Sequence, residues 1–66
     1  MADYYVNNKA QQNGDHEVHI ATCTYLPSDR KYLGNFSECA PAVRKAKETY
    51  RQANGCYWCS PACHTT

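Results

Sequence analysis

Three cysteines and a histidine lie within residues 56–64, close to the carboxyl end of the chain. Cys56 and Cys59 form a Cys-x2-Cys pair, a spacing that lets two sulfur atoms converge on one tetrahedral ion. Zinc is the metal that such a pair most often holds. Because a zinc site of this kind is tetrahedral, the Cys-x2-Cys pair supplies only half of the ligands, and two further ligands are predicted elsewhere in the chain.

We expect the other two ligands to be His19 and Cys23, which flank the predicted end of a strand. A separation of four residues allows both side chains to fold onto one ion. Alternatives remain open, because Cys63 or His64 could take the place of His19. Cys63 could instead lie near Cys39 and tie the end of the chain to the start of the helix.

The size of the chain makes a cross-link valuable. With 66 residues it is predicted to be one zinc-binding domain, 1–66, and a chain of this size buries only about 60% of its unfolded surface. The mean hydropathy is −0.79, and six Tyr, one Trp and one Phe must supply much of the core. A bound metal ion would compensate for the small apolar core.

The cysteine count and the charge narrow the function classes. Five cysteines cannot all pair in disulfides. No secretory signal or apolar span is apparent, so we expect a reducing, cytoplasmic setting and no membrane partner. A secreted disulfide scaffold whose signal was removed is the alternative. A net charge of +1 argues against binding dominated by nucleic-acid phosphates.

An α+β fold is expected from the order of the patterns. Residues 4–6 and 16–20 predict a β-hairpin, joined by a polar loop that ends in Asn13-Gly14. Residues 31–36 predict a possible third strand, weakened by Gly34. A Cys-x2-Cys knuckle follows at the carboxyl end.

The clearest helix is predicted over residues 42–54, entered through residues 37–41 with Ser37 as N-cap. Its apolar stripe has helical spacing and consists of Val43, Ala46, Tyr50 and Ala53. The pair Asn54-Gly55 predicts a left-handed stop. Its basic face is expected to be solvated.

The ligand spacing resembles that of the N-terminal metal-binding domain of Ada-type DNA-alkylation repair proteins. The resemblance rests on His19-x3-Cys23, the helix that follows, and Cys56-Tyr57-Trp58-Cys59, over roughly residues 16–59. That family carries Cys-x3-Cys and Cys-x2-Cys pairs on one zinc. The chain is also similar to small bacterial domains in which the first cysteine is replaced by histidine. The resemblance implies that His19, Cys23, Cys56 and Cys59 bind Zn²⁺.

The departure from the Ada pattern bears on activity. In that family a zinc-bound thiolate of the first pair attacks a methyl phosphotriester, and the matching position here is His19. We therefore expect a non-catalytic, monomeric recognition module with a structural zinc and a protein or nucleic-acid partner. Tyr57 and Trp58 are candidates for an exposed stacking surface, or alternatively pack against Tyr50.

Two other functions remain open. The first is a thiol-based alkyl acceptor or redox protein that uses Cys39 or Cys63, since the helix dipole would activate a thiol in the first turn. The second is a protein that handles exchangeable zinc through Cys63 and His64.

Overall fold

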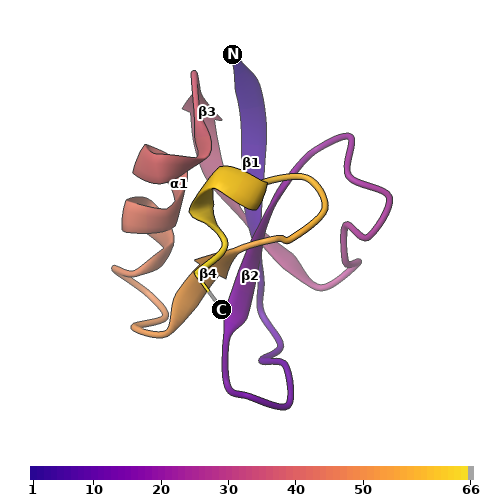
Figure 1. Ribbon diagram of the computed structural model, residues 1–66, viewed down its shortest axis with the longest axis vertical. Coiled ribbons are helices and arrows are strands. Elements are labelled where there is room, and N and C mark those ends of the chain that lie inside the picture. The colour runs from indigo at the N-terminus through magenta and orange to yellow at the C-terminus, as the bar shows by residue number, and fades with distance from the viewer. Residues whose placement is uncertain (66) are drawn as a thin grey trace.

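A computed structural model describes residues 1–65 of the chain (Figure 1). It confirms a small α+β fold with one α-helix, and the sheet within these residues has four strands, one more than the possible three that the sequence predicted. The elements in chain order are β1 (Ala2–Asn7), β2 (His16–Ile20), β3 (Arg30–Phe36), α1 (Cys39–Ala46), β4 (Ala53–Gly55) and the 3₁₀ turn η1 (Pro61–Cys63). No helix within residues 1–65 has the length and apolar character required to cross a bilayer.

The predicted hairpin is present. β1 and β2 pair antiparallel, with Tyr4 opposite Ile20 and Val6 opposite Val18. Gly14 has a φ of +93°, so the loop reverses at the position where a residue without a Cβ accepts this conformation most easily. The possible third strand also forms, because β3 pairs antiparallel with β1 across a bulge.

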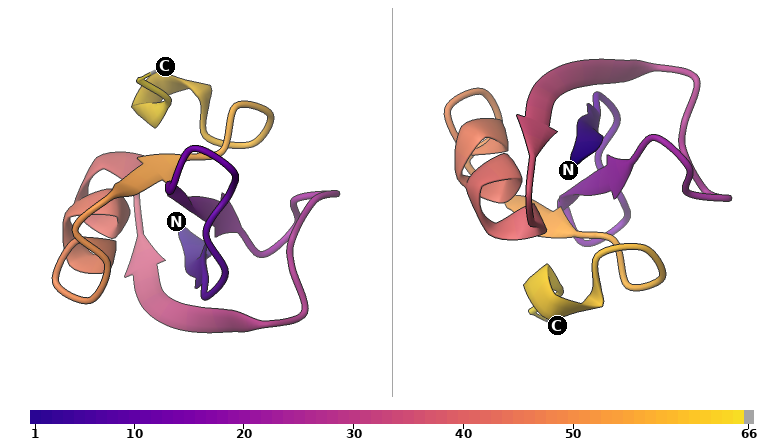
Figure 2. Two further views of the ribbon diagram at one scale, coloured as in Figure 1. Left: turned by 90° about the horizontal axis from the view of Figure 1, so that it is seen from below. Right: turned by 90° about the horizontal axis from the view of Figure 1, so that it is seen from above.

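The sheet has the order β3-β1-β2-β4, and α1 contacts both edge strands because the sheet curls (Figure 2). The core between the sheet and α1 is small. It is made of Tyr4, Val6, Val18, Leu33, Cys39, Ala42, Ala46 and Ala53. Three of these eight residues are alanines, so the apolar side chains alone give this domain limited stability.

The helix is shorter than the periodicity predicts. It ends at Ala46, and Ala53 belongs to strand β4. Tyr50 does not continue the stripe, because its ring stacks on His16 at 3.9 Å between centroids. Its hydroxyl also donates a 2.7 Å hydrogen bond to Asn8. Because these contacts join Tyr50 to residues of the β1–β2 hairpin, they favour an early end of the helix. The contacts are distant in sequence, so the local hydrophobic periodicity does not predict them.

The beginning of the helix also differs in detail. Glu38 occupies the N-cap position, rather than Ser37, and no side chain caps the helix. Pro41 lies within the first turn, where the helix needs no N–H from it.

The prediction of a left-handed stop at Asn54-Gly55 is wrong, because both residues lie in β4 and Gly55 has no positive φ. A glycine is required there for space. A Cβ on Gly55 would lie 2.6 Å from the Cβ of Cys63 and 2.8 Å from the carbonyl oxygen of Ser60. The C-terminal segment, residues 60–65, therefore packs directly on β4.

A disulfide joins Cys39, at the start of α1, to Cys63 in η1, with their Cα atoms 6.2 Å apart. The C-terminal segment is fixed further by polar contacts to β4. His64 Nδ1 lies 3.1 Å from the carbonyl oxygen of Gly55, and the Thr65 amide donates to Asn54 at 3.1 Å. The alternative that places Cys63 near Cys39 is the one that the structure contains.

Candidate metal centre

Parallel pairing of β2 and β4 places the first two candidate ligands side by side. Val18 is opposite Gly55, and the amide of Cys56 donates a 2.9 Å hydrogen bond to the carbonyl oxygen of Val18. The next residue on β2 is His19, whose side chain lies on the opposite face from the core residue Val18 because strand residues alternate. His19 and Cys56 are thus held at the same level by backbone hydrogen bonds.

Two tight turns bring in the other two candidates. Directly after β2, the amide of Cys23 donates to the carbonyl oxygen of Ile20 at 3.0 Å. After β4, the amide of Ser60 donates to the carbonyl oxygen of Cys56 at 2.9 Å, which closes the knuckle that carries Cys59. Each turn follows a strand end without a spacer, so both sulfur atoms face the space between the two strand ends.

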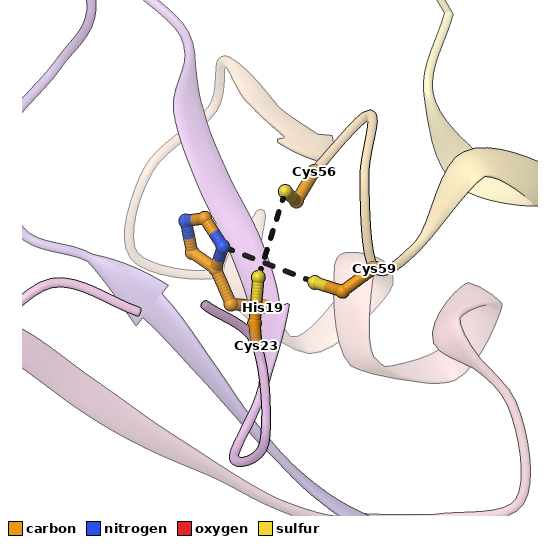
Figure 3. A group of neighbouring side chains, drawn as sticks. All are labelled: His19, Cys23, Cys56 and Cys59. Carbon is orange, nitrogen blue, oxygen red and sulfur yellow. Dashed lines mark hydrogen bonds between the residues drawn. The ribbon is translucent and has the colours of Figure 1, made fainter. Parts of the chain in front are cut away.

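The four candidate ligands His19, Cys23, Cys56 and Cys59 form one cluster, called here the metal cluster. Their ligand atoms all lie within 4.8 Å of one another and point toward a common centre (Figure 3). The sulfurs of Cys23 and Cys56 are 3.9 Å apart, as are Cys59 Sγ and His19 Nδ1. A tetrahedral zinc with bonds of about 2.3 Å to sulfur and about 2.0 Å to nitrogen separates its ligands by about 3.5–3.8 Å. A small contraction would therefore complete a tetrahedral site.

Glu17 orients the imidazole. One carboxylate oxygen lies 3.5 Å from Nε2 of His19, on the side of the ring away from the sulfur atoms. With its proton on Nε2, the imidazole would present the lone pair of Nδ1 to a metal, as in a carboxylate–histidine–zinc triad. Burial lowers the pKa of His19, and Glu17 only partly opposes this shift, so the neutral form suited to metal binding is favoured.

Two thiols of the cluster, Cys56 and Cys59, are affected by burial. Burial raises the pKa of Cys56 and of Cys59. Backbone N–H groups act in the opposite direction, those of Cys59 and Trp58 on Cys56 and that of Ile20 on Cys59. These amides favour the thiolate form, and a bound dication would favour it further.

The remaining cysteines and histidines lie outside the metal cluster. Cys39 and Cys63 form the disulfide, so neither sulfur is a free thiol in this structure. His16 stacks on Tyr50, and His64 makes its contact with Gly55 and packs edge-on to Tyr57. Neither Cys63 nor His64 replaces His19.

An open groove of about 390 Å³ borders the metal cluster. Its lining consists of Ile20, Thr22, Cys23, Thr24, Tyr25, Trp58 and Cys59. Trp58 is 67% exposed, Tyr57 is 56% exposed, and neither packs against Tyr50. The alternative that buries Tyr57 and Trp58 is therefore wrong.

The chain matches no protein-family model, no curated protein and no solved structure.

Glu17 and Tyr25 lie at the site but are not among the site residues predicted from the sequence. The pairing of Glu17 with His19 has a signal, since residues two apart share one face of a strand. Tyr25 has none, because its contact with Trp58 depends on how two loops meet.

Proposed function

We propose that His19, Cys23, Cys56 and Cys59 hold one Zn²⁺ ion whose role is structural. The observation that supports this best is the convergence of three sulfur atoms and one imidazole nitrogen within 4.8 Å. Sulfur and imidazole donors in tetrahedral reach are the set that zinc prefers. Four protein ligands leave no open position for water or substrate, which is the arrangement of structural sites.

A structural ion would connect parts of the chain that the core connects weakly. Cys23 and Cys56 are 33 residues apart in sequence, and the ion would join the turn after β2 to the knuckle after β4. In a domain with so few large buried side chains, the free energy of metal binding would become free energy of folding.

Recognition of a protein or nucleic-acid partner is the function that we propose for the domain as a whole. Tyr57 and Trp58 are exposed on the knuckle, and their rings meet edge to face at 4.9 Å. Exposed, touching aromatic rings are typical of surfaces that bind partners rather than of solvated loops. We propose no catalytic role for the metal cluster.

The resemblance to the Ada-type metal-binding domain is proposed for the metal site and not for the activity. The position that carries the reactive thiolate in that family is His19, which cannot accept a methyl group in the same way. Three thiolates around a dication with one neutral imidazole also carry a net charge of about −1, less than the about −2 of four thiolates, and so are less nucleophilic.

Native mass spectrometry combined with cysteine alkylation tests the proposal. We expect one zinc ion per chain, with Cys23, Cys56 and Cys59 protected until a chelator is added. Chelation should then abolish the dispersed amide spectrum. Cys39 and Cys63 serve as internal controls, because their protection should survive chelation and end only when a reductant is added.

The same experiment separates the alternatives. A chain that keeps its fold without metal would overturn the structural role. Rapid loss of zinc to a moderate chelator, with the fold retained, would favour the exchangeable zinc-handling function. A thiol in the zinc-loaded protein that reacts faster than free cysteine would favour the alkyl-acceptor or redox function.

A further inference from the structure

The groove beside the metal cluster exposes only half of that cluster. His19 and Cys56 are each 1% exposed, whereas Cys23 and Cys59 are partly exposed and line the groove. The side of the groove that these two cysteines form, called here its floor, is therefore partly accessible to solvent. A zinc-bound thiolate keeps lone pairs that accept hydrogen bonds from N–H donors.

Aromatic rings form the wall of the groove. Tyr25 is 58% exposed and its ring centroid lies 6.0 Å from that of Trp58, at an interplanar angle of 33°. Tyr57 supports Trp58 from outside the groove through the edge contact. The two lining rings are tilted against each other, and Thr22 and Thr24 belong to the same lining.

The metal cluster would determine the charge of the groove. None of the Lys, Arg, Asp or Glu residues described in the structure lines it. Its floor would carry the net charge of about −1 of a zinc ion with three thiolates and an imidazole, so the inference rests on the proposed metal site. Glu17, behind His19, adds a further negative charge nearby.

We propose that this groove binds an arginine side chain of a protein partner. A guanidinium group is planar and weakly hydrated, so it stacks on Tyr25 and Trp58 while its N–H groups donate to the sulfurs and hydroxyls. A lysine ammonium group has the positive charge but no planar face for stacking. A nucleobase is planar but carries no positive charge, and the phosphates of a nucleic acid would be repelled by the negative charge of the floor.

Three matched pentapeptides test the proposal on the full-length, zinc-loaded protein. Each has the form acetyl-Gly-Gly-X-Gly-Gly-amide, where X is arginine, its neutral isostere citrulline, or lysine. Trp58 is the only tryptophan, so its fluorescence reports binding, and amide chemical shifts locate the site. We expect shifts confined to residues 20–25 and 56–59, and affinity for arginine at least roughly fivefold above that for citrulline.

Tyr25→Leu should weaken binding of the arginine peptide roughly two- to fivefold, as expected for one exposed cation–π contact. Tyr32→Leu is the matched control, since Tyr32 is also exposed but lies on β3 outside the groove. This control should bind like the unchanged protein.

Equal affinity for arginine and citrulline would overturn the proposal, and so would tighter binding of lysine. Tighter binding of a single-stranded oligonucleotide, or no binding of any probe, would overturn it as well. Zinc loading is measured separately by mass. If the zinc-loaded protein does not bind the arginine peptide, only this inference is overturned. If the protein takes up no zinc, the proposed metal site is overturned.

Discussion

The five cysteines of this chain are used in two different ways. Cys39 and Cys63 form a disulfide that anchors the C-terminal segment to α1. Cys23, Cys56 and Cys59 stay free and gather with His19 around one centre. The odd cysteine count is explained by this division, because an imidazole completes the second set.

The two sets differ in what surrounds them. Cys39 belongs to the apolar core, where a covalent bond between two sulfurs leaves no charge to solvate. The free thiols have backbone N–H groups aimed at the sulfurs of Cys56 and Cys59, a carboxylate behind His19, and a groove on one side. In this protein, polar surroundings distinguish the candidate metal ligands from the disulfide cysteines more clearly than cysteine spacing does.

Removing a buried ligand should have the largest effect. Cys56→Ser replaces a thiolate that is 1% exposed, so we expect loss of zinc and of the cooperative thermal transition followed by circular dichroism. Structural zinc contributes roughly 10–16 kcal/mol in small domains, which exceeds or equals the whole stability of most domains. A cooperative transition in zinc-free Cys56→Ser would contradict the account.

Removing the disulfide should cost less and leave the metal cluster intact. For a loop with a sequence separation of 24 residues, the chain-entropy relation predicts a loss of about 3.5 kcal/mol in the double variant Cys39→Ser, Cys63→Ser. Denaturant unfolding measures the loss, and native mass spectrometry should still find one zinc per chain. Loss of zinc from this variant would show that the two sets are not independent.

Gly55 lies between the two sets, and Gly55→Ala tests the contact directly. The added Cβ would meet Cys63 and Ser60 at less than 3 Å, so the C-terminal segment must move. We expect a loss of about 1–3 kcal/mol in the free energy of unfolding. Gly14→Ala is a useful comparison, because there the cost arises from the positive φ, and the added Cβ would contact the side chain of Gln52 and neither set of cysteines. A neutral Gly55→Ala would show that the segment packs differently.

The smallest effect is expected at Glu17. Glu17→Gln keeps a side-chain oxygen of similar reach near Nε2 of His19 but removes the negative charge. We expect zinc affinity to fall about tenfold, near 1.4 kcal/mol, with the fold retained. Glu48→Gln is the control, because Glu48 is an exposed carboxylate that pairs with Lys45 on the surface. Equal affinities of the two variants in a chelator competition would remove Glu17 from the site.

The sequence predicted β1, β2, β3 and the grouping of His19, Cys23, Cys56 and Cys59 better than it predicted the helix and β4, whose residues were assigned to the helix end. Ligand chemistry is specific, since few residue types bind zinc and Cys-x2-Cys restricts their geometry. The stripe that includes Tyr50 and Ala53 was misleading because helical periodicity is local. Parallel pairing of β4 with β2, and the stacking of Tyr50 on His16, depend on residues more than 30 positions away.

Other features had no signal in the sequence. The disulfide was one of several open pairings, because spacing alone does not determine which cysteines meet. Gly55 was given the role of a helix stop, whereas it provides space for Cys63. Tyr25 reaches the groove only through the loop between β2 and β3. The predictions of a monomer, a cytoplasmic location and Ada-type kinship stay predictions.

X-ray absorption at the zinc edge of the loaded, disulfide-intact protein tests the central claim most directly. We expect a tetrahedral shell of three sulfur atoms at about 2.3 Å and one nitrogen at about 2.0 Å. In His19→Cys, the nitrogen contribution should be replaced by a fourth sulfur. A shell rich in oxygen, or one with four sulfurs in the unchanged protein, would contradict the assignment of His19, Cys23, Cys56 and Cys59.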